Sequence, residues 1–351
     1  MRVGLVLGAG GVVGASWLIG ALEALESETG WRVSGAEHIV GTSAGSVIGA
    51  LAAAGVEPAL MGAYASGSVL DDVVDAEQRA GLAGDRVEGS ELRLQLALPP
   101  IGPGSWRLAV GTLAHPRRHA PAALLAGWIP RGFISTQPVQ RLVETFIPGA
   151  WPGHDNYWAV AADYTTGRHV PFGRTGAPPA RVAEAVAASC AIPGFYHPVR
   201  IGGRRYIDGG VCSASNLDLL RHAGLDLVVC VNPMSSVIDA LKGGRPAERM
   251  VALMRAATGR RLGHEARKLR EAGTEVLLLQ PDADDCSLMG LNLMRGTRRA
   301  EVMEQARVGV ARQLRDLRSQ PVLLPGRSRR RRRPAAAVAP VASPVAAKRA
   351  A

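Results

Sequence analysis

The sequence contains little cysteine and few aromatic residues, and both shortages restrict what the protein can be. Its 351 residues include four cysteines, with no CxxC pair and none before residue 190. This usage excludes a disulfide framework and a cysteine-based zinc site, and it fits a reducing, cytoplasmic setting. Aromatic residues make up only 4% of the chain. A nucleic-acid partner is therefore not expected, because such surfaces usually interleave basic and aromatic side chains.

Acidic residues are missing from the C-terminal end. The formal charge of the chain is +11, from 41 basic and 30 acidic residues, but residues 327–351 hold eight of the bases and no acid. The rest of the chain carries 33 bases and 30 acids and is nearly neutral. Residues 326–351 are mainly Ala, Pro, Val and Arg without hydrophobic period, which predicts a disordered tail. Such a tail is most often a solvated chain end, and the alternative is peripheral association with an anionic membrane.

Charge is also absent from residues 3–22, a run of 20 residues that follows Arg2. Such a run is typical of a signal peptide or a membrane span. Six of its residues are glycine, which lowers both the apolarity and the helix propensity of the segment. We interpret the run as a short strand, a glycine-rich loop and a helix, with a signal peptide as the alternative.

Apolar runs of strand length alternate with segments of helical period along most of the chain. The first two units are a strand at 2–7, a loop at 8–14 and a helix at 15–25, then a strand at 38–40, a turn at 41–45 and a helix at 46–54. Further strands are predicted at 226–231 and 275–279, hairpins at 158–172 and 199–207, and helices at 136–146, 181–190, 248–272 and 297–318. The alternation predicts an α/β fold of three layers, α/β/α, around a mainly parallel sheet.

The stretch 81–132 breaks this pattern, because proline and glycine recur and the apolar residues have no sustained period. We therefore predict an insertion. Its composition suits a lid at a lipid interface with anionic headgroups, through Trp106, Leu124, Leu125 and Trp128 beside Arg117 and Arg118. A small satellite core under a long loop is the alternative.

The residues from Gly41 to Gly45 match the pattern GxSxG. They lie between an apolar strand and an Ala-rich helix, where a sharp strand-to-helix turn would lift the Ser43 hydroxyl above the sheet edge. The two flanking glycines would admit the tight backbone. Because the chain contains 42 glycines, a chance match is a real risk, and a serine that only caps the helix is the alternative.

The loop from Gly8 to Gly14 is the second candidate motif. The dinucleotide fingerprint GxGxxG would need a glycine at position 13, which is Val13, and no acid follows at the distance that a ribose ligand requires. A nucleotide-dependent oxidoreductase would thus rest on this loop alone. The loop would present consecutive backbone N–H groups at a helix N-terminus, which suits an oxyanion, and a tight turn without a ligand is the alternative.

A serine nucleophile needs a proton acceptor. None of the eight histidines lies in a glycine-rich strand end, and Ser43 comes too early in the chain for an α/β-hydrolase. Asp208, in contrast, ends a predicted strand and is followed by Gly209 and Gly210, which let the backbone turn sharply. A plain Asp-Gly hairpin turn is the alternative.

Four blocks follow one another in the chain: the loop Gly8–Gly14, the GxSxG segment, an apolar helix-to-loop break at Ala188–Phe195, and Asp208-Gly209-Gly210. Together they resemble the patatin-like phospholipase family. The resemblance implies a patatin-like fold and a Ser-Asp dyad that works without histidine. By the same resemblance Ser43 is the nucleophile, Asp208 is the proton acceptor, and the N–H groups of Gly10, Gly11 and Val12 form the oxyanion hole.

The resemblance further implies a lipid carboxylic ester as substrate, hydrolysis of the lipase, phospholipase or lysophospholipase type, and no metal or organic cofactor. It divides the chain into a catalytic domain at 1–225, which contains the insertion, a segment at 226–325 that completes the same fold, and the tail. The sequence departs from the family's loop at Ala9, which replaces a glycine, and at Val13, which replaces a basic residue. A non-catalytic lipid-binding or regulatory protein on the same fold is therefore the alternative function.

Overall fold

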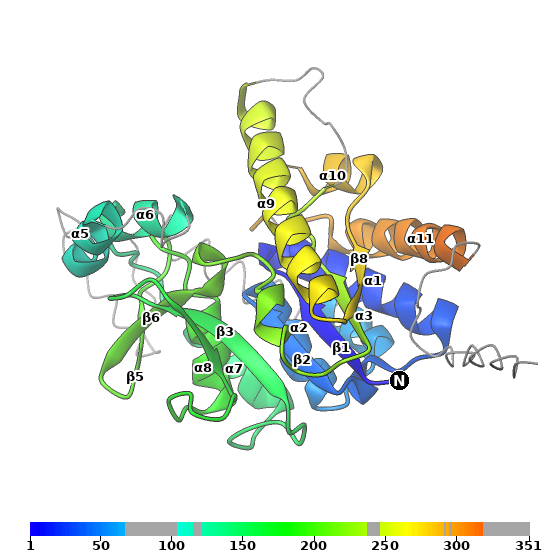
Figure 1. Cartoon of the computed structure of the whole chain (residues 1–351), viewed down its shortest axis with the longest axis horizontal. Coiled ribbons are helices and arrows are strands. Elements are labelled where there is room, and N and C mark those ends of the chain that lie inside the picture. The colour runs from blue at the N-terminus through cyan, green and yellow to red at the C-terminus, as the bar shows by residue number, and fades with distance from the viewer. Residues whose placement is uncertain (67–103, 115–120, 237–245, 291–292, 295–296, 319–351) are drawn as a thin grey trace, which may run out of the picture.

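A computed structural model of the chain describes residues 1–66, 104–114, 121–236, 246–290, 293–294 and 297–318 (Figure 1). Within these residues, eight strands form one sheet, in which the hydrogen-bonded neighbours follow the path β5-β6-β3-β2-β1-β7-β8 and β4 also pairs with β3. The strands are β1 (Val3–Leu7), β2 (His38–Thr42), β3 (Tyr157–Asp163), β4 (His169–Phe172), β5 (Val199–Ile201), β6 (Arg204–Asp208), β7 (Leu227–Val231) and β8 (Glu275–Leu279). Pairing is parallel from β3 through β2, β1 and β7 to β8 and antiparallel elsewhere, which confirms the predicted mainly parallel sheet.

β1 lies at the centre of the sheet, because it pairs in parallel with β2 on one edge and with β7 on the other. All five of its residues are buried. Leu5 and Leu7 pack into the hydrophobic cluster on one face of the sheet and Val6 into the cluster on the opposite face. A strand covered on both faces needs an uninterrupted apolar run, because its side chains alternate between the two faces.

Helices cover both faces of the sheet. One face carries α1 (Gly11–Thr29), α2 (Ala44–Ala53), α3 (Pro58–Ser66), α7 (Gln137–Phe146), α8 (Val182–Ser189) and α11 (Arg299–Arg318), whose buried side chains share one cluster. The other face is covered by α9 (Pro246–Glu271), which lies in front of the strands in Figure 1, and by the 3₁₀ segment Leu217–Leu220. This arrangement confirms the predicted three layers.

Two strands share one edge of β3. Ile39 of β2 donates its N–H to Asn156 O at 3.0 Å, and Tyr164 donates its N–H to Arg205 O next to β6 at 2.9 Å. The bonding groups belong to the even-numbered residues Asn156 and Tyr164. The N–H and C=O of one residue point to the same edge of a strand, and those of the next residue point to the opposite edge. β2 and β6 therefore lie on the same edge of β3.

The C-terminal ends of β2 and β6 meet on that edge. β2 runs parallel to β3 and its Thr42 pairs with Val160, whereas β6 runs antiparallel and its Asp208 pairs with Ala161. The two strands thus approach each other head-on and stop at neighbouring residues of β3. Residues that follow or end these strands are brought together although they are far apart in the sequence.

The sequence prediction was wrong about the start of the first helix. α1 begins at Gly11 rather than at Ala15, and the Gly14 N–H donates to Gly10 O at 2.9 Å. Val13 is buried in the same turn. Packing of the apolar side chains against the core outweighs the low helix propensity of glycine here.

The predicted insertion contains two helices that the sequence pattern did not reveal, α5 (Trp106–Ala114) and α6 (Pro121–Trp128). The helix α10 (Ala283–Met289) and α3 were not predicted either. Residues 81–103 and 115–120 of the insertion, with Arg117 and Arg118, and the tail at 326–351 lie outside the described residues. In the part of the chain that is described, no helix is long and apolar enough to cross a bilayer.

Candidate active site

Ser43 occupies a strained turn between β2 and α2. Its φ of 53° and ψ of −123° are unusual for a residue with a Cβ, and such a conformation costs about 1–3 kcal/mol. Two hydrogen bonds hold it: the Ser43 N–H donates to Ser189 Oγ at 2.9 Å, and Ser43 O accepts from the Ser46 N–H at 2.7 Å. The turn is the strand-to-helix elbow that the GxSxG pattern predicts.

The flanking glycines are required by close backbone contacts. A Cβ at Gly45 would lie 2.1 Å from Leu7 O at the end of β1, and a Cβ at Gly41 would lie 2.3 Å from Gly45 O. Neither neighbour can move, because both are main-chain atoms. The elbow therefore packs directly against β1, and any larger residue at these two positions would push Ser43 away from the sheet.

Asp208 lies at the end of β6 and is hydrogen-bonded to the Ser43 hydroxyl. Its Oδ1 also accepts the Gly210 N–H at 2.7 Å. Burial raises the pKa of the Asp208 carboxyl to about 6, and the hydrogen bonds from Ser43 and from the Gly210 N–H lower it in part. Both side chains are nearly inaccessible to solvent, with 4% exposure for Ser43 and 5% for Asp208.

Two polar side chains connect the strand ends that carry Ser43 and Asp208. The Ser189 hydroxyl, which accepts the Ser43 N–H, donates to Val160 O on β3 at 2.6 Å. The Asn216 Nδ2 group donates to Thr42 Oγ1 at 3.0 Å and to Gly209 O at 3.4 Å, and so connects the end of β2 to the turn after β6. Both side chains are fully buried, so these bonds are shielded from water.

The glycine-rich loop lies beside the same turn. Ala9 is close to Gly210, since a Cβ at Gly210 would lie 3.6 Å from Ala9 Cβ. The Gly8 N–H donates to Val231 O at 2.9 Å and the Ala9 N–H to Ala214 O at 2.8 Å. These bonds fix the loop to the end of β7 and to the segment that follows Asp208.

Three consecutive backbone donors of this loop have no protein acceptor among the described residues, namely the N–H groups of Gly10, Gly11 and Val12. The next donor, the Val13 N–H, is taken by Leu293 O at 3.0 Å. The Val13 side chain is buried in the core cluster, so it does not project toward solvent as a basic residue there would. Replacement of the basic residue thus leaves the three upstream donors in place.

The structure brings the sequence-predicted residues to one place. Ser43 and Asp208 are in contact, and the predicted motif glycines lie in the loop, the elbow and the turn around them: Gly8, Gly14, Gly41, Gly45, Gly209 and Gly210. Ser189 belongs to the block Ala188–Phe195, but no pattern assigned it to Ser43. Asn216 was not predicted, because the bonds from its side chain to Thr42 and Gly209 join segments that only the fold brings together.

A family model for patatin-like phospholipases matches residues 5–221, which is more than half of the chain. The chain belongs to the patatin-like phospholipase family. The match begins in β1 and ends just after the 3₁₀ segment Leu217–Leu220, so it includes every patatin-like block described above. Membership supports lipid acyl hydrolase activity in general.

Three solved structures are similar to this patatin-like chain over 90% of its length. They are VipD from Legionella pneumophila, with 13% identity and a TM-score of 0.41, the type III effector ExoU, with 16% and 0.36, and the ExoU–SpcU complex of the type III secretion system of Pseudomonas aeruginosa, with 20% and 0.39. The chain covers 67%, 53% and 51% of those proteins, respectively, so it spans only about half of the ExoU chains.

Proposed function

We propose that the protein is a serine hydrolase of lipid carboxylic esters that works through a Ser43–Asp208 dyad. The hydrogen bond between the Ser43 hydroxyl and the buried Asp208 carboxylate carries this proposal. The N–H groups of Gly10, Gly11 and Val12 serve as the oxyanion hole. They are unpaired among the described residues and belong to a loop that contacts the turn after Asp208.

The reaction proceeds in two halves. In the first, Ser43 Oγ attacks the acyl carbon and its proton passes to Asp208, while the loop N–H groups stabilise the negative charge on the carbonyl oxygen. The bond to the alcohol then breaks, and the alcohol leaves with the proton from Asp208. In the second, Asp208 takes a proton from water as the water oxygen attacks the acyl-serine. The bond from the acyl carbon to Ser43 Oγ then breaks, Asp208 returns the proton to Ser43 Oγ, and the fatty acid is released.

Burial favours this chemistry in two ways. It excludes water and strengthens the hydrogen bond between Ser43 and Asp208, which helps a carboxylate to act on a hydroxyl of much higher pKa. It also raises the pKa of Asp208 to about 6, so that the carboxyl group is a stronger base once ionised than an exposed aspartate is. The dyad needs no organic cofactor or metal for these steps.

A fluorophosphonate probe tests the nucleophile. We expect labelling of the wild-type protein and none of Ser43→Ala, with a loss of at least about 10⁴-fold in ester hydrolysis. Ser34→Ala is the matched control, because Ser34 is an exposed serine outside the site. Failure of the folded wild type to react, or equal turnover by Ser43→Ala, would exclude the dyad. Lipid binding with no turnover of any acyl ester would instead favour a non-catalytic lipid-binding protein.

We also propose that the insertion acts at a lipid surface and that the domain limits follow the family resemblance, with catalysis in 1–225, completion of the fold by 226–325 and a separate tail. β7 and β8 pair in the same sheet as β1, in agreement with one fold. The arginine-rich tail would add peripheral attraction to an anionic membrane at about 1 kcal/mol per charge. Removal of residues 327–351 should weaken binding to anionic vesicles and leave hydrolysis of a soluble ester unchanged; unaltered vesicle binding would assign the tail no such role.

A further inference from the structure

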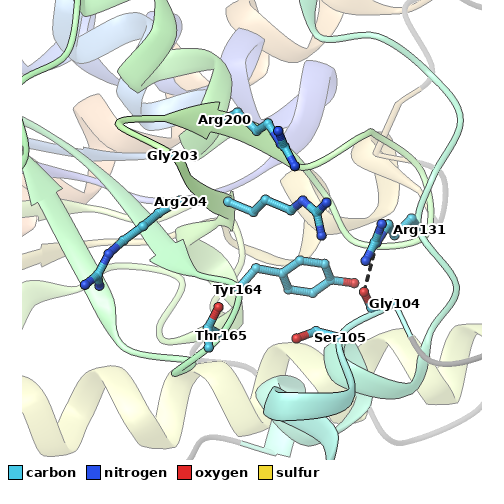
Figure 2. Close-up of a pocket in the computed structure, with 9 residues that line it drawn as sticks. Gly104, Ser105, Arg131, Tyr164, Thr165, Arg200, Gly203 and Arg204 are labelled. Carbon is cyan, nitrogen blue, oxygen red and sulfur yellow. Dashed lines mark hydrogen bonds between the residues drawn. The ribbon is translucent and has the colours of Figure 1, made fainter.

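A cavity lies away from the dyad, between the β3–β6 end of the sheet and the α5–α6 hairpin. It measures about 210 Å³ and is lined mainly by arginine side chains, with Ser105 and Tyr164. Figure 2 shows the Arg131 and Arg200 side chains converging above the Tyr164 ring, whereas Arg204 points away. Arg205, which lies on β6, completes the lining. The cavity is therefore a cationic pocket with a few hydroxyl groups.

The positive charge in this pocket is not neutralised by the described part of the chain. Arg204 pairs with Asp163 at 3.3 Å, but no described carboxylate pairs with Arg131, Arg200 or Arg205. Arg131 is held in place by its Nε group, which donates to Gly104 O at 2.9 Å. Arg131, followed by burial and by Arg200, lowers the pKa of Arg205. Like charges gathered without a counter-ion are stabilised when an anion binds between them.

The size and the donors of the pocket indicate what kind of anion it takes. Its volume is below the roughly 300–1,000 Å³ of sites that enclose a drug-sized ligand. It is too small for an acyl chain and large enough for one phosphate group. Guanidinium groups bind phosphate oxygens in pairs of parallel hydrogen bonds, which is the geometry that several converging arginines provide.

Exposed apolar side chains lie on the α5–α6 hairpin next to the pocket. The Gly104 N–H donates to Ile129 O and the Ser105 N–H to Gly127 O, both at 3.2 Å, so that one wall of the pocket is the base of the α5–α6 hairpin. The exposed apolar side chains on and after this hairpin are Trp106, Val110, Leu125, Trp128, Ile129 and Phe133. Trp106, Leu125 and Phe133 are more than 60% exposed. Aromatic and aliphatic groups beside cationic ones are typical of a membrane-contacting surface.

We propose that Arg131, Arg200 and Arg205 bind the phosphate group of an anionic phospholipid, with the apolar residues of the α5–α6 hairpin seated in the same lipid surface. The site is distinct from the dyad, because Arg205 and Asp208 lie three residues apart on β6, which corresponds to roughly 10 Å. The proposal goes beyond the hydrolase function: this lipid is one that positions the protein, and its binding does not depend on turnover.

Sedimentation with vesicles tests the site in the full-length chain carrying Ser43→Ala, so that no substrate is consumed. Phosphatidylcholine vesicles with and without phosphatidic acid are compared. We expect that Arg131→Gln and Arg205→Gln, introduced together into this chain, weaken binding to the phosphatidic acid vesicles at least tenfold, since each charge contributes about 1 kcal/mol. Arg221→Gln with Arg267→Gln is the control, because it removes two exposed charges elsewhere and should have a much smaller effect.

Further measurements test the same arginine pocket. Arg200→Gln, which removes an exposed side chain, should weaken binding in the same direction if the double variant folds poorly. Inorganic phosphate should compete with the vesicles, as the shared ligand chemistry requires. Equal losses in the control, or no loss in either arginine variant, overturn the proposal; phosphate binding without a vesicle effect overturns its membrane part. Soluble-ester hydrolysis by variants with Ser43 intact reports on the dyad separately.

Discussion

The two ends of β6 are built in opposite ways. At the C-terminal end, Asp208 is buried, its oxygens are hydrogen-bonded, and the surrounding glycines leave no free space. At the N-terminal end, Arg205 lines an open pocket with Arg131 and Arg200 and has no described counter-ion. A strand of five residues thus joins a rigid, dry site suited to chemistry to an open, charged site suited to recognition.

The difference shows why a lipid hydrolase can separate these tasks. A reacting pair must be held within a fraction of an ångström, which requires close packing and complete hydrogen bonding. A site that meets a membrane must instead keep its charges accessible, so that they pair only when the surface is reached. Substitutions at the two ends should therefore have effects of different kind and size.

The largest expected effect is that of Asp208→Asn on catalysis. Loss of the proposed proton acceptor should reduce ester hydrolysis by at least about 10³-fold. The same change should stabilise the fold, because a carboxyl group whose pKa rises from 3.8 to about 6 on folding costs stability increasingly between these two pH values, and by up to about 3 kcal/mol above pH 6. Urea unfolding at pH 5 and pH 8 would measure this, since the wild type should lose stability as pH rises through 6 and the variant should not.

Arg205→Gln, at the other end of β6, should leave soluble-ester turnover intact. A loss as large as that of Asp208→Asn would contradict the contrast between the two ends of β6.

Glycine replacement should separate the two regions in stability. We expect Gly45→Ala to lower the free energy of unfolding by more than about 3 kcal/mol, because the new Cβ would lie 2.1 Å from Leu7 O. Gly111 is the matched position in α5, where a Cβ meets nothing within 4 Å. There alanine should be neutral or stabilising by up to about 1 kcal/mol, given its helix propensity. Similar unfolding midpoints for the two variants would contradict the close packing of the elbow.

The buried hydroxyl of Ser189 offers a finer test. Ser189→Ala leaves the Ser43 N–H and Val160 O without a partner, and we expect kcat to fall about 10- to 100-fold as the elbow loosens. Thr112→Ala is the comparison near the arginine pocket, because Thr112 is buried and its hydroxyl donates only within α5. It should change stability slightly and leave kcat for a soluble ester unchanged. The rate of fluorophosphonate labelling should likewise fall in Ser189→Ala and stay unchanged in Thr112→Ala. An unchanged rate in Ser189→Ala would show that Ser189 does not position Ser43.

The smallest expected effect is that of pH. The base must be ionised, so hydrolysis should fall as pH drops through about 6 and be about tenfold lower at pH 5 than on the plateau. Arg205→Gln should not shift the pH at which hydrolysis of a soluble ester falls, because the arginine pocket is separate from Asp208. A fall of hydrolysis near pH 4 instead of pH 6 would mean that Asp208 is not desolvated in the working protein.

Sequence patterns predicted the sheet well, and for a physical reason. Buried parallel strands need continuous apolar runs, so β8 was predicted at the residues it occupies and β7 to within one residue. Helices α5 and α6 were missed because they are short and rich in small apolar residues, which conceals the helical period.

The site was only partly predictable. The motif blocks point to Ser43 and Asp208, but their contact depends on β6 running antiparallel along the edge of β3 that β2 also uses. Spacing in the sequence contains no information on this arrangement. The arginine pocket was not predicted at all, because Arg131, Arg200 and Arg205 converge only through the α5–α6 hairpin and β6, and isolated arginines are ordinary surface residues.

The meeting of β2 and β6 on β3 also sets an order of events during synthesis. The chain emerges from its N-terminus, so Ser43 and its helix are present long before residue 208 exists. The elbow then lacks both Asp208 and the Ser189 hydroxyl that accepts its N–H. Any reaction that needs both members of the pair must wait until β6 has docked. A chain that ends before β6 therefore lacks one member of the proposed pair, and we expect it not to hydrolyse lipid esters.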